Sequence, residues 1–313
     1  MSLSIILQQM GVICILVFIG ILLQKKGVID NLTSKKISAI VVDVCNPGLI
    51  MASILGGNIT AEHKDLIYAA GLGFAFYALL LIIGLIMPRI LRVAPDKRKF
   101  YNLMSVYTNI GFLGIPVAKA ILPPNAIIYV IVVNVFYCLL FYTHGMAVLG
   151  NGPEGSGKSK GSSLRNIINP GTVMAVLSLV VFWFDVKLPP ILSNTVEYVG
   201  NATIFLSMAL LGVSIARSRF FECLKDIRIW VFIVLRMILL PILIVLILHA
   251  VSFDKTATLA MCLMAAVPVG NLPMIQAEKK GMDTTILSSA IAVTTVVSIV
   301  TITVLISVAT ALL

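Results

Sequence analysis

The octapeptide GPEGSGKS, residues 152–159, matches the phosphate-binding pattern G-x-x-x-x-G-K-[ST] at every fixed position. Such a loop binds a nucleotide when its glycines let backbone amides hold the phosphates, its lysine reaches the terminal phosphates and its serine binds magnesium. This chemistry needs a buried strand before the loop and a helix after it. Here apolar stretches end near Leu149 and begin near Ile167. We therefore expect residues 150–166, rich in Gly, Ser and Lys, to form a flexible cytoplasmic linker that binds no nucleotide.

A different chemistry is indicated by two apolar stretches that each hold an asparagine beside Gly and Pro. They are YNLMSVYTNIGFLGIPVAKAIL, with Asn109, Gly111, Gly114 and Pro116, and TATLAMCLMAAVPVGNLPMIQAEKK, with Pro268, Gly270, Asn271 and Pro273. Proline removes an amide donor and glycine adds backbone freedom, so each stretch should unwind in its middle. The register between them is open, since Pro116 can correspond to Pro268 or to Pro273.

The broken stretches are suited to bind an anion. A half-helix that starts at each break, near Pro116 and near Pro273, presents free amides and the positive end of its dipole. Asparagine side chains add hydrogen bonds to a carboxylate without a fixed charge. We therefore predict a site for an organic anion, formed by Asn109, Gly111, Pro116, Gly270, Asn271 and Pro273.

The composition places these residues in a membrane. The chain has 313 residues, of which 59% are hydrophobic and 12% charged, and its mean hydropathy is +1.07. Such a chain cannot have the polar surface of a soluble protein. Its net charge of +10 is not arranged as a basic stripe with interleaved aromatic residues, so we expect no nucleic-acid partner. The five cysteines show no CxxC spacing and no His/Cys/Asp pattern suggests a metal, so we expect no metal and no cofactor.

Apolar windows of the length that crosses a bilayer predict an all-α polytopic protein. The ten predicted spans are residues 3–23, 37–55, 66–88, 100–122, 126–149, 167–184, 190–214, 229–251, 256–277 and 285–312. The connections after the odd-numbered spans hold 18 of the 23 Lys and Arg residues. By the positive-inside rule these connections are cytoplasmic and both termini lie outside. Two halves of five spans, 1–149 and 167–313, then insert in opposite directions and permit an inverted repeat, with the breaks in spans 4 and 9 at matching places.

Charged and titratable side chains within the spans are candidates for function. Asp43 and Glu197 occupy corresponding places in the two halves and are followed by Asn46 and Asn201. These four can carry a coupling proton or bind sodium, or they can be satisfied polar contacts near the lipid interface. Arg236 in span 8 can attract the anion, neutralise a buried acid or extend its charge to the cytoplasmic surface. His144 is expected to be an interfacial polar residue rather than a proton relay.

Several short motifs resemble the auxin efflux carrier family, which groups plant PIN carriers with bacterial malate and malonate permeases. They are VVDVCNPGLIMASI, TNIGFLGIPVAKAILPPNA, SMALLGVSIA, LRMILLPILI and MAAVPVGNLPMIQAEKKGMD. The resemblance covers essentially the whole chain. It implies a fold similar to sodium/proton antiporters and bile acid symporters, in which spans 1, 2, 6 and 7 are a scaffold and spans 3–5 and 8–10 a moving transport domain. It also implies elevator-type transport of organic anions, a carboxylate flanked by Asn109 and Asn271, and, as in some members, a homodimer.

These observations predict a secondary transporter of small carboxylates, such as malate, malonate or auxin-like acids, in a cell membrane. The alternative is a cation/proton antiporter of the same fold that uses Asp43 and Glu197, although neither break has a paired acid motif beside it. An enzyme is not expected, because no nucleophile–base pair or metal constellation is recognisable.

Overall fold

The computed structural model describes residues 3–55, 62–150, 170–218 and 220–313, and every regular element in these ranges is helical. The first half contains α1 (Leu3–Lys25), α2 (Asn31–Ile40), η1 (Val41–Cys45), α3 (Asn46–Leu55), α4 (His63–Ile90), η2 (Pro95–Lys97), α5 (Arg98–Val106), η3 (Ile110–Gly114), α6 (Ile115–Ile121), α7 (Ala126–Leu140), η4 (Phe141–Gly145) and α8 (Met146–Leu149). The second half contains α10 (Pro170–Trp183), α11 (Pro190–Arg217), α12 (Phe220–Cys223), α13 (Ile227–Ile233), η5 (Val234–Leu239), α14 (Leu240–Ala250), α15 (Lys255–Ala266), α16 (Asn271–Lys279) and α17 (Thr285–Leu312).

Among the described residues, six continuous helical stretches are long and apolar enough to cross a membrane, and four shorter apolar helices accompany them. This is a polytopic membrane protein. Each predicted span coincides with helical structure, with shifted bounds. The largest shift is in the second, where helix begins at Asn31 because the Asp30 carboxylate accepts a hydrogen bond from Thr33 N at 2.7 Å. Hydrogen bonds from the side chain and then the backbone N–H of Thr33 hold the pKa of Asp30 below its usual range. The linker motif GPEGSGKS lies outside the described residues.

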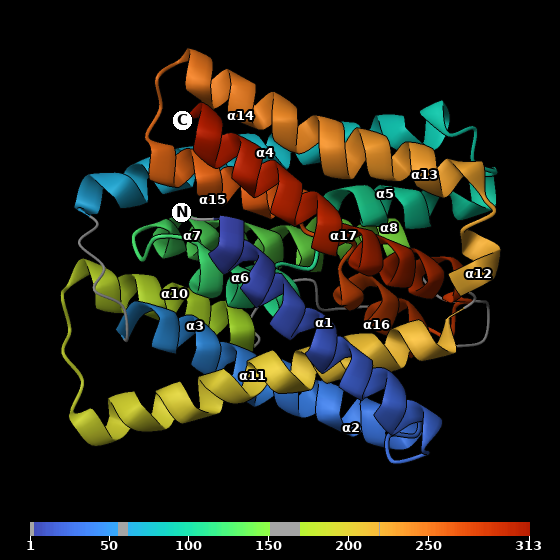
Figure 1. Ribbon diagram of the computed structural model, residues 1–313, viewed down its shortest axis with the longest axis horizontal. Helices are drawn as coiled ribbons and strands as arrows, with labels where there is room; N and C mark the ends of the chain where they lie inside the picture. Colours follow the sequence, from blue (N-terminus) through green and yellow to red (C-terminus); the bar gives the residue numbers. More distant parts are fainter. Residues whose placement is uncertain (1–2, 56–61, 151–169, 219) are drawn as a thin grey trace.

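Glycines let α11 approach α1 and α3 closely. A Cβ atom on Gly212 of α11 would lie 2.0 Å from Val17 O of α1, and one on Gly200 would lie 2.8 Å from Leu49 Cα of α3. Inside a bilayer the hydrophobic effect does not drive helices together, so their association depends on close packing. Small residues at the contact let the two backbones approach. In Figure 1, α1, α2, α3 and α11 accordingly group in the lower part of the view, while α4, α13 and α14 lie in the upper part.

Three of the long helical stretches contain a π-helical segment, namely η1, η4 and η5, and one of the shorter helices contains η3. The backbone hydrogen bonds of a π-segment span five residues instead of the four of an α-helix, which re-aims side chains, and such segments occur often at functional sites. The segments η1, η3 and η4 supply residues that line the cavities described below.

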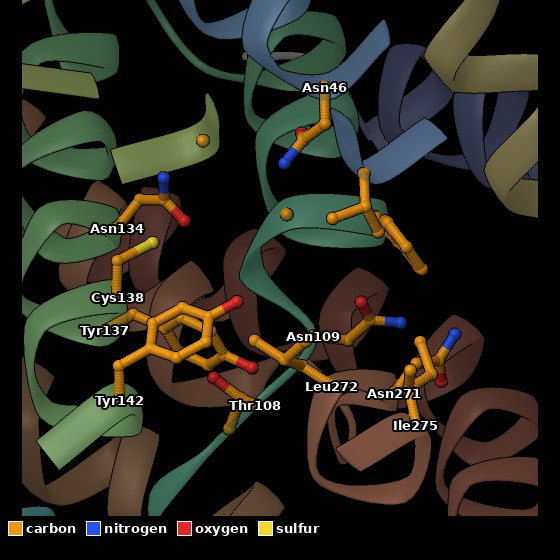
Figure 2. Close-up of a pocket in the computed structure, with 14 residues that line it drawn as sticks. Asn46, Thr108, Asn109, Asn134, Tyr137, Cys138, Tyr142, Asn271, Leu272 and Ile275 are labelled. Atoms are coloured by element: carbon orange, nitrogen blue, oxygen red, sulfur yellow. The ribbon is translucent and has the colours of Figure 1, made fainter. Parts of the chain in front are cut away.

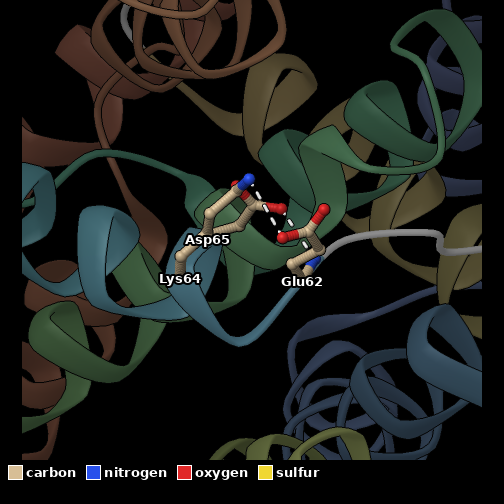
Figure 3. A network of polar contacts seen from close by, with 3 residues as sticks. All are labelled: Glu62, Lys64 and Asp65. Atoms are coloured by element: carbon tan, nitrogen blue, oxygen red, sulfur yellow. Dashed lines mark hydrogen bonds and ion pairs between the residues drawn. The ribbon is translucent and has the colours of Figure 1, made fainter.

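The start of α4 carries an exposed polar cluster (Figure 3). The Asp65 carboxylate accepts a hydrogen bond from Glu62 N at 2.7 Å, and Lys64 Nζ lies 2.9 Å from the Glu62 carboxylate. The side chains of Lys64 and Glu62 are 62% and 68% exposed, so the ion pair contributes little to stability. The cluster caps the first turn of α4, and none of its three residues lines the cavities described below.

Candidate functional site

The two broken stretches cross and pair through their extended residues. Thr108 and Val269 form an isolated antiparallel bridge. Asn109 N donates to Pro268 O at 2.8 Å, and Gly270 N donates to Tyr107 O at 3.0 Å. Non-helical backbone inside a membrane protein must find partners within the protein. The crossing therefore satisfies each break with groups of the other.

Helix resumes on the far side of each break directly at an asparagine. Asn109 is the N-cap of η3, and Asn271 is the first residue of α16. The predicted start near Pro273 is therefore confirmed to within two residues, whereas the predicted start near Pro116 is wrong. Pro116 does not interrupt the helix, because the Phe112 carbonyl four residues before it accepts a hydrogen bond from Ser207 Oγ at 3.1 Å. Pro273 lies in the first turn of α16, where its missing N–H has no helical partner to lose.

The prolines also do not occupy matching positions. Counted from the bridging pair, Pro116 lies eight residues after Thr108, whereas Pro268 precedes Val269 by one residue and Pro273 follows it by four. Across the antiparallel bridge Asn109 lies opposite Pro268 and Tyr107 lies opposite Gly270, so Pro116 faces neither proline of the second stretch there. The register between the two stretches stays a prediction.

Gly270 is required by the close approach of the two stretches. A Cβ atom there would lie 2.7 Å from Thr108 O and 3.0 Å from Tyr107 O. Both are backbone atoms of the facing stretch, which cannot rotate away as a side chain can. Only glycine fits this position without moving the crossing.

A small cavity of about 70 Å³ lies against the crossing. Its polar lining comes from Asn46, Thr108, Asn109, Asn134, Tyr137, Tyr142 and Asn271, together with Cys138, and none of its lining residues is charged. Figure 2 shows these groups reaching one space from α3, α7, η4, α16 and the break before η3.

Several of the polar atoms around this cavity have no hydrogen-bond partner. They are Asn46 Oδ1, Thr108 Oγ1, Asn109 Nδ2, Asn134 Nδ2 and Asn271 Oδ1. Thr108, Asn109, Asn134 and Asn271 are all at least 93% buried. Buried polar atoms are nearly always paired in folded proteins, so a group of unpaired ones around a cavity marks a place for a polar ligand. An amide can present either its NH₂ or its oxygen, which lets the same residues adapt to an anion.

A larger cavity of about 490 Å³ shares six lining residues with the small one, namely Val42, Phe112, Tyr142, Asn271, Leu272 and Ile275. It extends to the end of the molecule where α2 begins and α11 ends, and its lining includes Lys35, Asp43 and Arg217. Charged groups thus lie along the approach to the crossing, while the small cavity itself is uncharged. We call the larger cavity the vestibule.

Comparison with known proteins identifies the class to which this architecture belongs. A family model described as membrane transport protein matches residues 5–306. The chain belongs to this membrane transport protein family. The resemblance to the auxin efflux carrier family is thereby confirmed. An uncharacterized transporter of Methanocaldococcus jannaschii is 23% identical over 216 residues, which cover 66% of this chain and 67% of the archaeal one. The protein is a membrane transporter, a class that is generally not enzymatic.

The transporter brings some of the predicted site residues together and leaves others out. Asn109, Gly111 and Asn271 line the small cavity. Gly270 is part of the crossing itself, and Pro116 and Pro273 are buried without lining either cavity.

The four predicted coupling residues separate into two pairs. Asn46 lines the small cavity and Asp43 lines the vestibule. Glu197 and Asn201 are exposed on α11 and line neither cavity. Their matching places in the sequence therefore do not give matching surroundings, because α11 turns this part of its surface away from the crossing.

Arg236 is only 1% exposed and lines neither cavity. The interpretation that its charge extends to the cytoplasmic surface is therefore wrong. His144 is half-buried, and its Nδ1 lies 2.9 Å from the Tyr107 hydroxyl, which donates to Leu140 O. It is packed beside the crossing, since Tyr107 is the C-cap residue of α5 and its carbonyl accepts the hydrogen bond from Gly270 N.

Four polar residues of the transporter's small cavity were not predicted from the sequence, namely Thr108, Asn134, Tyr137 and Tyr142. Asn134 carried a signal, because it is the one amide in the otherwise apolar run of α7, AIIYVIVVNVFYCLL. A buried polar residue within a span is a functional candidate by default. Thr108, Tyr137 and Tyr142 had no such signal, since hydroxyl side chains are common in membrane helices.

Proposed function

We propose that this transporter is a secondary carrier of small organic anions and binds a substrate carboxylate at the crossing, between the start of η3 and the start of α16. The observation that carries the proposal is the set of unpaired amides at these two helix starts, around a cavity without charged side chains. Each helix start contributes about half a positive charge, so the two together match about one carboxylate. Malate and malonate are the substrates of choice for a first test.

The polarity of the small cavity favours an anion over a metal cation. The unpaired polar atoms around it are the NH₂ groups of Asn109 and Asn134 and the side-chain oxygens of Asn46, Thr108 and Asn271, and the lining holds no carboxylate. A cation site of the same size would need oxygen ligands, of which carboxylates are the usual charged ones. A cation/proton antiporter that uses Asp43 and Glu197 is the weaker hypothesis, because Glu197 lines neither cavity.

We infer the following architecture and orientation. Ten spans form a 5+5 inverted repeat, with the crossing at its centre, both termini outside and the vestibule open to the cytoplasm of a cell. The excess of Lys and Arg in the odd-numbered connections supports this orientation. Lys35 and Arg217, which line the vestibule, belong to that basic side.

Transport then proceeds by elevator-type alternating access. Spans 1, 2, 6 and 7 form the scaffold, and spans 3–5 and 8–10 carry the site across it. The grouping of α1, α2, α3 and α11 in one part of Figure 1, and their close glycine contacts, supports a separate scaffold. Broken helices at the crossing of two repeats are typical substrate sites in secondary transporters.

Uptake into proteoliposomes tests the proposal. We expect radiolabelled malate or malonate to accumulate in vesicles with the wild-type protein. Asn109→Ala and Asn271→Ala should each weaken uptake, while Asn194→Ala, an exposed asparagine on α11, should not. Sodium flux in the same vesicles without uptake of any carboxylate would refute the anion carrier in favour of a cation antiporter.

A further inference from the structure

Arg236 is a buried cation that joins the two broken helices. Its Nε donates to Ser105 O at 2.8 Å, and its Nη1 donates to Ala265 O at 2.7 Å. Ser105 lies in the last turn of α5, and Ala265 in the last turn of α15. Within the described parts of the chain, no carboxylate lies at ion-pair distance from the guanidinium. Its charge is therefore met by backbone carbonyls alone.

Both carbonyls are free because the breaks redirect their helical donors. Ser105 O would accept from Asn109 N in a continuous helix, but Asn109 N donates to Pro268 O. Ala265 O would accept from Val269 N, but Val269 N donates to Thr294 Oγ1 at 3.3 Å. One guanidinium replaces the two missing backbone donors. Lysine, with a single point charge, cannot reach both carbonyls with the same geometry.

The charges at the crossing then balance in a particular way. The C-terminal ends of α5 and α15 each carry about half a negative charge, and together they match the single charge of Arg236. The N-terminal ends of η3 and α16 keep their positive potential for the small cavity. Because Nε and Nη1 of the guanidinium bind the two carbonyls, a metal cation at the same carbonyls would have to displace it, while Nη2 has no hydrogen-bond partner.

We propose that Arg236 is a positioning residue that serves as the permanent cation of the crossing. It caps the C-terminal ends of both first half-helices, fixes their spacing, and leaves the anion site dependent on no bound sodium ion. The last consequence rests on the proposed anion carrier, whereas the capping role does not.

Chemical rescue tests the capping role without any substrate. We expect Arg236→Ala to unfold in detergent at a lower temperature than the wild type, and guanidinium at concentrations far below denaturing ones to raise that temperature, while choline does not. Arg228→Ala is the matched control, because Arg228 is exposed at the start of α13, and should respond to neither. Equal effects of guanidinium and choline on Arg236→Ala would overturn the capping role.

Arg236→Lys keeps the measurement interpretable if the alanine variant does not fold. The lysine variant should fold and bind malonate about tenfold more weakly than the wild type, since it retains the charge but not both bonds. Wild-type affinity in this variant would overturn the proposal, as would malonate binding by the wild type that requires sodium. If no carboxylate binds the wild type although guanidinium rescues Arg236→Ala, the anion carrier fails and the capping role stands.

Discussion

Replacing Gly270 with alanine perturbs the crossing at the point where its two stretches are closest. The added Cβ would lie 2.7 Å from Thr108 O and 3.0 Å from Tyr107 O, distances shorter than ordinary van der Waals contact. The stretches must separate, which weakens the bonds from Asn109 N to Pro268 O and from Gly270 N to Tyr107 O. Each such hydrogen bond contributes about 1 kcal/mol, so about 2 kcal/mol is lost. If the site depends on this spacing, carboxylate binding weakens by roughly 30-fold.

The assay is the rise of the unfolding temperature with carboxylate concentration, because a ligand that binds the folded state stabilises it by mass action. Gly114→Ala is the matched control, since a Cβ there meets the flexible end of Met264 at 3.4 Å, and it should bind nearly as the wild type does. Size-exclusion chromatography checks that both variants are folded. If Gly270→Ala binds the carboxylate as tightly as Gly114→Ala, the spacing of the crossing does not control the site and the reasoning fails.

Four further substitutions test other parts of the structure. Asn134→Leu removes an unpaired donor from the small cavity and should weaken carboxylate binding about fivefold in the same thermal assay; unchanged binding would place the ligand elsewhere. If a proton that drives transport binds in the vestibule, Asp43→Asn should abolish the pH dependence of uptake and Glu197→Gln should retain it. The reverse result would contradict a proton site in the vestibule. Lys158→Ala should leave uptake unchanged, and ATP should not raise the unfolding temperature of the wild type, so a requirement for Lys158 would restore the nucleotide-binding interpretation. Gly212→Val, whose Cβ meets Val17 O at 2.0 Å, should lower the unfolding temperature far more than Gly11→Val, whose Cβ has nothing within 4 Å; equal effects would contradict the close packing of α1 on α11.

The positions of the breaks were predictable because they depend on local properties of the chain. Proline and glycine disrupt a helix wherever they occur in series, and each break lies beside the asparagine predicted there. The place where helix resumes in the first stretch was not predictable. Pro116 remains within a helix because the Phe112 carbonyl, which Pro116 leaves without a helical donor, accepts a hydrogen bond from Ser207, 95 residues away in the chain. The sequence around Pro116 does not indicate such a distant partner.

Long-range contacts also explain why other site residues escaped prediction. The role of Arg236 depends on carbonyls 131 and 29 residues away, and its sequence position alone allowed several interpretations. Glu197 and Asn201 looked equivalent to Asp43 and Asn46 by place in the chain. Helix rotation decides which side chains face the crossing, and the weak amphipathicity of membrane helices leaves that rotation unmarked in the sequence.

The central claim, that a carboxylate binds between the starts of η3 and α16, is tested most directly by an experimental density map of the transporter in saturating malonate. We predict ligand density in the small cavity, with a carboxylate within hydrogen-bond distance of the Asn109 and Asn271 side chains. Density in the vestibule beside Asp43 with the small cavity filled only by water would contradict the claim.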